Sequence, residues 1–158
     1  MTYAPQAMTL ATPIGTILLQ GNETELTGVT IGVDAGVQSG DDLPTDSPVM
    51  RAAEQLREYF AGQRQDFDLP LARLKSARGQ ALRAAIASLP YGHTMTYGAL
   101  AKLHDSGPRA VGQACRRNPF PVIIPCHRVT SSAGPEYYSG GSGVDTKAWL
   151  NAFERSSI

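Results

Sequence analysis

The chain has little cysteine, no long apolar run and no net charge. Two cysteines in 158 residues are too few for a disulfide framework and favour free thiols in a reducing compartment. No stretch approaches the roughly 20 apolar residues that cross a membrane. A formal net charge of zero excludes a global basic field that would attract nucleic acid. Residues 1–13 lack the charged start and apolar core of a signal peptide, so we expect a cytoplasmic protein.

The charges are unevenly distributed along the chain. Acidic residues collect in the segment 34–46, whereas the segments 108–117 and 125–128 carry arginines and no acidic residue. We therefore expect a local basic face on an otherwise neutral protein.

The first half of the chain predicts a small α+β unit. Residues 7–31 alternate in polarity and predict an antiparallel hairpin, and the polar segment 34–47 predicts a loop. Ser47 followed by Pro48 is typical of a helix start. This helix is expected to end at Gly62. Its expected apolar face consists of Val49, Ala53, Leu56 and Phe60.

The second half predicts helices, beginning with an alanine-rich one over residues 77–88. Two short helices joined by a glycine-containing turn then give the outline of a helix-turn-helix. Thr96 can cap the first, which would bury Leu100 and Leu103, and Pro108 fits the first position of the second. Helical spacing places three polar residues on one face of the second: Arg109, Gln113 and Arg116. A plain helical hairpin with a solvated polar face gives the same pattern.

The proline-rich segment 118–129 presents a cysteine directly before a histidine and an arginine. Its three prolines fix the backbone, so we expect an extended, rigid segment. His127 and Arg128 are the kinds of neighbour that lower the pKa of a thiol, and we interpret Cys126 as a nucleophile. Adjacent residues of an extended chain point to opposite sides, so contact between Cys126 and His127 requires a bend or a bridging water.

Two other roles for Cys126 stay open, a structural thiol and a metal ligand. Zinc sites use closely spaced cysteines and histidines, and this sequence has no such set, so we expect no metal and no cofactor. Cys115 falls within a predicted helix and is interpreted as a packed small side chain, although a disulfide between Cys115 and Cys126 is not excluded.

The C-terminal helix, expected from Lys147 onward, has two faces. One carries Lys147, Leu150 and Glu154, and the other carries Trp149 and Phe153. The first face is either a solvated surface around one leucine or part of the site, with Glu154 orienting His127. In the second case the glycine- and tyrosine-rich loop 138–141 would close over a flat substrate.

The tetrad Pro-Cys-His-Arg at 125–128 is preceded by "RAVGQACRRNPFPVII" and followed by "YSGG", a lysine, "WL" and a glutamate. Around this tetrad the chain resembles the O6-alkylguanine-DNA alkyltransferases. The resemblance extends to "ATPIGTILL" and "PYGHTMTYGALA" and so covers nearly the whole chain. It implies an α+β fold. A small N-terminal α/β domain, similar to ribonuclease H, is expected over residues 1–72. A mostly helical C-terminal domain with the helix-turn-helix is expected over residues 73–158.

The resemblance also implies direct-reversal DNA repair. The alkyl group of O6-alkylguanine, and less readily of O4-alkylthymine, would move to Cys126 in a single irreversible turnover after base flipping. The implied catalytic residues are Cys126, His127 acting through a water, Glu154 and Asn118. The implied substrate-binding residues are Tyr97, Pro121, Tyr138, Ser139, Lys147 and Val129. The implied DNA-binding residues are Arg109, Ala110, Gly112, Thr96, Gln113, Arg116 and Arg128. Arg109 would fill the gap left by the flipped nucleotide, and the partner would be the minor groove of double-stranded DNA bound by a monomer.

The chain departs from the family pattern in three places. The turn at 104–108 is shorter, the loop between 141 and 147 is longer, and the helix over 77–88 lacks the usual Phe-Gln start and tryptophan.

Three rival interpretations make different demands on the sequence. A non-catalytic alkyltransferase-like protein would have replaced Cys126. A Cys-His hydrolase or thiol transferase would turn over repeatedly and need no helix-turn-helix. A sequence-specific regulator would read the major groove with long polar side chains, whereas Ala110 and Gly112 favour recognition of shape and backbone.

Overall fold

The computed structural model describes residues 5–33, 43–131, 141 and 143–157. The chain divides into two compact units, Met1–Ala72 and Arg73–Ile158. None of the described helices is both long and apolar enough to cross a membrane.

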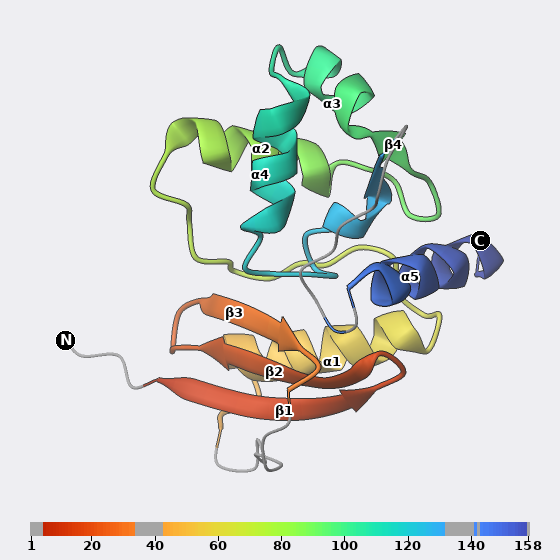
Figure 1. Ribbon diagram of the computed structural model, residues 1–158. Coiled ribbons are helices and arrows are strands. Elements are labelled where there is room, and N and C mark those ends of the chain that lie inside the picture. Colours follow the sequence, from red (N-terminus) through yellow and green to blue (C-terminus); the bar gives the residue numbers. More distant parts are fainter. Residues whose placement is uncertain (1–4, 34–42, 132–140, 142, 158) are drawn as a thin grey trace. The chain divides into compact units, whose positions relative to one another are not determined.

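The first unit is a three-stranded antiparallel sheet with one helix along it (Figure 1). The strands are β1 (Gln6–Thr12), β2 (Gly15–Gly21) and β3 (Leu26–Ile31), and the helix is α1 (Pro48–Phe60). The central strand β2 pairs with both neighbours, so the hairpin expected over residues 7–31 is confirmed. Ile17 and Leu19 of β2 are fully buried, and α1 packs on all three strands.

Helix α1 begins as the sequence predicts. The Ser47 hydroxyl oxygen accepts a hydrogen bond from the Met50 amide at 3.3 Å, and proline occupies the first turn. The expected apolar face is wrong at its end, because Tyr59 rather than Phe60 is fully buried. The Tyr59 ring lies between the rings of Phe60 and Phe67, at centroid distances of 5.0 and 5.6 Å.

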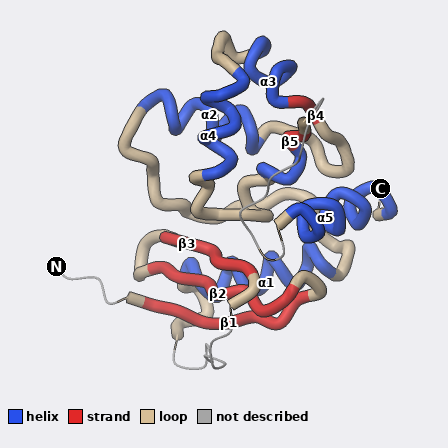
Figure 2. Tube along the Cα trace, viewed as in Figure 1, coloured by secondary structure: helices blue, strands red, loops and turns tan. Residues whose placement is uncertain are grey.

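The second unit is mostly helical (Figure 2). Its elements are α2 (Ala77–Ala87), β4 (Met95–Thr96), α3 (Tyr97–Leu103), α4 (Pro108–Arg116), the 3₁₀ turn η1 (Cys126–Arg128), β5 (Val129–Thr130) and α5 (Val144–Ser156). Strands β4 and β5 pair in parallel, which ties the start of α3 to the end of η1. Helix α4 packs against both α3 and α2.

The two helices of the predicted helix-turn-helix are present, and both begin as expected. The Thr96 hydroxyl oxygen accepts a hydrogen bond from the Ala99 amide at 3.1 Å, and Pro108 is the first residue of α4. The prediction that Leu103 is buried is wrong. Leu100 is 1% exposed, but Leu103 is 68% exposed, because it is the last residue of α3 and the chain turns away at His104.

These two leucines give a matched test of the packing of α3. Leu100→Ala should lower the free energy of unfolding by about 2–5 kcal/mol, because it leaves a cavity in the core of the helical unit. Leu103→Ala should change it by less than about 0.5 kcal/mol, because this side chain already lies in water. Urea unfolding of both variants measures the difference, and similar losses would contradict the described orientation of α3.

Candidate active site

The segment before Cys126 is folded back on itself, so the prediction of an extended segment is wrong. The Ile124 amide donates to the Phe120 carbonyl at 2.8 Å, and Val122 has a φ of 75°. A β-branched residue rarely adopts this left-handed conformation, which costs on the order of 1–3 kcal/mol. Asn118 closes the turn: its side chain accepts from the Phe120 amide at 3.0 Å and donates to the Ile124 carbonyl at 2.9 Å.

Cys126 opens the 3₁₀ turn η1 and is 3% exposed. The Asn118 side-chain amide also donates to its Sγ atom at 3.2 Å. Burial raises the pKa of the Cys126 thiol, although the hydrogen bond from Asn118 and the charge of Lys147 act in the opposite direction. The resting group is therefore a neutral thiol, which needs a base before it can react as a nucleophile.

His127 is fully buried, and its Nε2 atom lies 2.7 Å from Oε2 of Glu154. Burial lowers the pKa of His127, against the opposing effect of the Glu154 carboxylate. A neutral imidazole next to a carboxylate carries its proton on the facing nitrogen, so Nε2–H donates to Glu154. Nδ1 is buried without a hydrogen-bond partner among the described residues, and its lone pair can accept a proton.

The Glu154 carboxylate is 1% exposed and accepts four hydrogen bonds. Arg128 donates two, from Nε to Oε1 at 2.8 Å and from Nη2 to Oε2 at 3.0 Å. The Gly92 amide donates a further one at 3.2 Å. Nη1 of Arg128 donates to the Leu89 carbonyl at 2.7 Å. The prediction that Arg128 contacts DNA is wrong, because this side chain is 4% exposed and all three of its nitrogens face internal acceptors.

Lys147 is buried and lies near the same site. It is 3% exposed, and its Nζ atom is 5.6 Å from the centroid of the half-buried Tyr97 ring. The interpretation of the first face of α5 as a solvated surface is therefore wrong. Its other face is as expected, with the rings of Trp149 and Phe153 stacked at 5.0 Å.

The remaining residues expected at the substrate pocket are only partly described. Pro121 and Val129 are buried, Val129 completely, so a base could meet little of Val129 beyond its backbone. Tyr138 and Ser139 lie outside the described residues.

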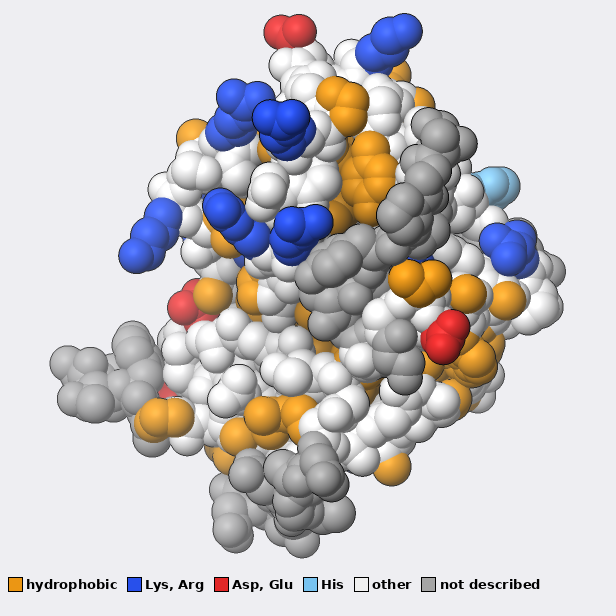
Figure 3. Space-filling view, viewed as in Figure 1, with side chains coloured by type: hydrophobic (Ala, Val, Ile, Leu, Met, Phe, Trp, Pro, Cys, Tyr) orange, Lys and Arg blue, Asp and Glu red, His pale blue; other side chains and the backbone are white. Residues whose placement is uncertain are grey.

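Helix α4 presents polar side chains to solvent. Arg109, Gln113 and Arg116 are exposed, as their spacing predicts. Ala110 and Gly112 are half-buried, and a Cβ atom built on Gly112 would meet nothing within 4 Å. Packing within the chain therefore does not require glycine at this position. Most of the charged side chains visible on the helical unit are Lys and Arg (Figure 3).

Two contacts of the site were missed by the sequence analysis. The Asn151 side chain donates to the His127 carbonyl at 2.9 Å, and the Leu89 carbonyl accepts from Arg128. Asn151 could have been found, because it follows Lys147 by four residues and precedes Glu154 by three, on the same helical face. The backbone acceptor leaves no signal in the sequence.

Cys115 is a second free thiol in the same unit. It is 7% exposed, and burial raises its pKa to about 12. It does not form the disulfide with Cys126 that the sequence left open. Across residues 5–33, 43–131, 141 and 143–157, no three potential metal ligands lie together.

A buried thiol, followed directly in the chain by an imidazole that a carboxylate orients, provides a nucleophile and a base, so these residues are typical of a thiol-dependent transfer protein. Two family models match the chain. They are described as the ribonuclease-like domain and the DNA binding domain of 6-O-methylguanine DNA methyltransferase, over residues 7–73 and 78–156. The chain belongs to this family.

Curated relatives and a solved structure match the chain over nearly its whole length. The constitutive methylated-DNA–protein-cysteine methyltransferase of Bacillus subtilis (strain 168) is 33% identical over 157 residues, 94% of each chain. That of Methanosarcina acetivorans is 37% identical and covers 91% of this chain and 94% of the relative. The crystal structure of Mycobacterium tuberculosis OGT in complex with DNA superposes with a TM-score of 0.78 at 32% identity, over 96% of this chain and 94% of that one.

The protonation of His127 tests the described electrostatics. We expect its imidazole to titrate below the ordinary value of 6.5, because burial outweighs the carboxylate. Glu154→Gln should lower the midpoint further, since it removes the group that favours the charged form. An unfolded histidine binds its proton at higher pH than this one, so the folded state loses stability as pH falls below about 6.5. Nitrogen chemical shifts of the His127 ring, recorded over a pH series, give the midpoint in the wild-type protein and in Glu154→Gln. A wild-type midpoint above 6.5 would contradict the conclusion that burial outweighs the carboxylate.

Proposed function

We propose that this chain repairs O6-alkylguanine in DNA by transferring the alkyl group to its own Cys126. The observation that carries the proposal is the buried Cys126 thiol, adjacent in sequence to a neutral His127 held by Glu154, in the same unit as the predicted DNA-binding helices. The relatives support it, because they are named methylated-DNA–protein-cysteine methyltransferases and match the chain almost end to end. O4-alkylthymine is the proposed lesser substrate.

The proposed reaction is a displacement at the alkyl carbon. The Cys126 proton passes to Nδ1 of His127 through a water, and the thiolate attacks the carbon attached to O6. The sulfur–carbon bond forms as the carbon–oxygen bond breaks, and the bonding electron pair leaves with the purine. Tyr97 donates a proton toward the departing guanine and recovers it from the imidazolium. Atoms and electrons balance without an oxidant, a reductant or a cofactor, and the product thioether ends the turnover.

Glu154 and Arg128 serve this reaction by holding the base in position. The carboxylate fixes the ring tautomer that leaves Nδ1 free to accept, and it stabilises the imidazolium once the proton has moved. Arg128 fixes the carboxylate through two parallel hydrogen bonds, a geometry that guanidinium provides and ammonium does not. Arg128 is therefore a positioning residue, and Asn118 has the same role toward Cys126.

The proposed DNA interface is the exposed face of α4. Arg116 and Gln113 would contact the backbone, and the small Ala110 and Gly112 would let the helix approach the minor groove closely. Thr96, at the start of α3, is proposed to lie at the edge of the same interface. Arg109 stands exposed at the second position of α4, where a long, flat cation can replace the extruded base in the stack. The solved relative in complex with DNA supports DNA as the partner, and we propose that this DNA is double-stranded.

The proposed pocket for the extruded base lies between α3, η1 and α5. We propose that Tyr97, Lys147 and Pro121 line it, together with Tyr138 and Ser139. The chain is proposed to act as a monomer in the cytoplasm, associated with the nucleoid while bound to DNA.

Self-alkylation at Cys126 is the direct test of the proposed function. Incubation with duplex DNA that contains O6-methylguanine should add one methyl group per molecule, located on the peptide that contains Cys126. Cys115→Ala should react like wild type, because the pKa of the Cys115 thiol, raised to about 12, keeps it protonated and unreactive. Intact-mass and peptide mapping measure both. Repeated turnover, or methylation confined to Cys115, would refute the proposal.

The wedge role of Arg109 predicts a loss that depends on the substrate. Base extrusion costs on the order of a few kcal/mol, so Arg109→Ala should slow transfer from duplex DNA strongly. The free base O6-benzylguanine needs no extrusion and should react nearly as with wild type. Arg109→Lys should resemble the alanine variant on duplex DNA, because ammonium stacks poorly. Stopped-time transfer assays compare the substrates, and equal losses on both would point to a displaced Cys126 instead.

A further inference from the structure

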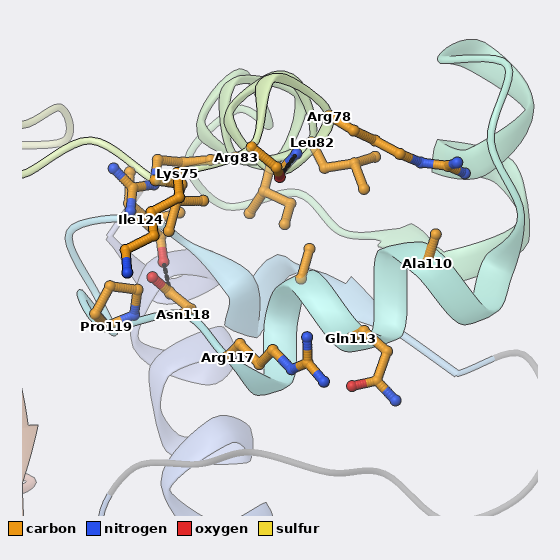
Figure 4. Close-up of a pocket in the computed structure, with 15 residues that line it drawn as sticks. Lys75, Arg78, Leu82, Arg83, Ala110, Gln113, Arg117, Asn118, Pro119 and Ile124 are labelled. Carbon is orange, nitrogen blue, oxygen red and sulfur yellow. Dashed lines mark hydrogen bonds between the residues drawn. The ribbon is translucent and has the colours of Figure 1, made fainter.

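The helical unit has a hollow between α2 and α4. Its volume is about 410 Å³, and α2, α4 and the turn after α4 line it (Figure 4). The apolar part of its lining includes the buried Leu82, Ile86 and Ile124. Asn118, which holds Cys126, is one of the lining residues, but neither Cys126 nor His127 lines the hollow, so the proposed transfer chemistry does not account for the rest of it. We call it the α2–α4 groove.

The charged side chains that line the α2–α4 groove are all cationic. They are Lys75, Arg78, Arg83 and Arg117, and no aspartate or glutamate is among the lining residues. Lys75, Arg78 and Arg117 are exposed at its rim. In Figure 4, Arg78 extends toward the Ala110 end, whereas Lys75 lies toward the Pro119 end.

Arg83 places a buried positive charge in the lining. It is 7% exposed, and its guanidinium lies 5.1 Å from the centroid of the Phe120 ring. Burial lowers the pKa of Arg83, which means that the surroundings disfavour its charge. An anion in the groove would offset this cost by attraction. Such a lining fits a ligand with negative groups on an otherwise apolar body.

The α2–α4 groove is continuous with the proposed DNA-binding face of α4. Ala110 and Gln113 belong to both, since they are part of that face and also line the groove. Arg117 follows directly after α4, one residue beyond the exposed Arg116. A strand that leaves the face of α4 in this direction enters the groove.

We propose that the α2–α4 groove binds the sugar–phosphate backbone of the same duplex that α4 engages, with Lys75, Arg78 and Arg117 neutralising its phosphates. The deoxyribose groups would lie against the apolar lining. This inference rests on the proposed function, because it takes DNA as the ligand. It extends the footprint past the recognition helix to a second element, α2.

Salt dependence tests this proposal, because each neutralised phosphate releases counterions. The double variant Arg78→Ala/Arg117→Ala should reduce the slope of log K against log salt by about 2 on undamaged duplex DNA, since each contact contributes roughly 0.9. The matched control Arg57→Ala/Arg155→Ala also removes two exposed arginines and should keep the wild-type slope. Arg78→Lys/Arg117→Lys should keep it as well, because the charge is retained. Fluorescence anisotropy over a sodium chloride series provides the slopes.

Transfer from free O6-benzylguanine should stay unchanged in all three variants, which shows that the fold and the thiol site are intact. If wild type binds and repairs duplex DNA but the double variant keeps its slope, the groove proposal falls and the proposed function stands. If the wild-type protein neither binds duplex DNA nor repairs duplex DNA that contains O6-methylguanine, the proposed function itself fails. In a third outcome the double variant keeps the wild-type slope, the wild-type protein binds inorganic phosphate, and the double variant does not. This result would assign the groove to a small anion and would overturn the proposal.

Discussion

The buried carboxylate of Glu154 is the interaction on which the helical unit depends. A carboxylate that is 1% exposed is costly unless its oxygens are fully hydrogen-bonded, and removing one partner of such a pair costs about 3–5 kcal/mol. Its four donor atoms belong to Gly92, in the turn before β4, and to His127 and Arg128 of η1. One side chain of α5 thus joins segments that lie more than 60 residues apart in sequence, as the separation of 62 between Gly92 and Glu154 shows.

This carboxylate also decides how charge is shared at the site. Burial lowers the pKa of His127, and the charge of Arg128 acts in the same direction, so His127 can remain neutral although it touches a carboxylate. A bare carboxylate in the same place would favour a permanent imidazolium, which cannot accept a proton. Asn118 provides the second fixed point, because one amide group holds both the turn carbonyl of Ile124 and the sulfur of Cys126. Different residues therefore position the thiol and its base: Asn118 holds Cys126, and Glu154 holds His127.

The sequence predicted most of the fold, because caps and apolar periodicity act locally. Ser47 and Thr96 cap helices where expected, since each accepts a hydrogen bond from its own first turn, and Pro108 begins α4 because its fixed φ suits the first turn. One error falls where distant contacts decide, because the internal acceptors of Arg128 remove it from solvent. Others lie at helix ends, where Tyr59 rather than Phe60 is buried and Leu103 is exposed. At the site, Cys126, His127 and Glu154 were identified, and the structure pairs His127 with Glu154, but the folding back of residues 118–124 was not predicted. The prolines predict a rigid segment but not its direction. The direction depends on the hydrogen bonds of the Asn118 side chain to Phe120 and Ile124.

The protected position of Cys115 has a consequence for how a population of these molecules would behave. A thioether on Cys126 could be reopened only by another strong nucleophile, and the second thiol of the chain, with a pKa of about 12, stays protonated at neutral pH. Each molecule would then be consumed by one lesion, so the capacity of a cell would be set by copy number rather than by rate. Damage below that number would be cleared completely. Damage above it would persist until new chains are synthesised, which gives the response a threshold instead of a gradual decline.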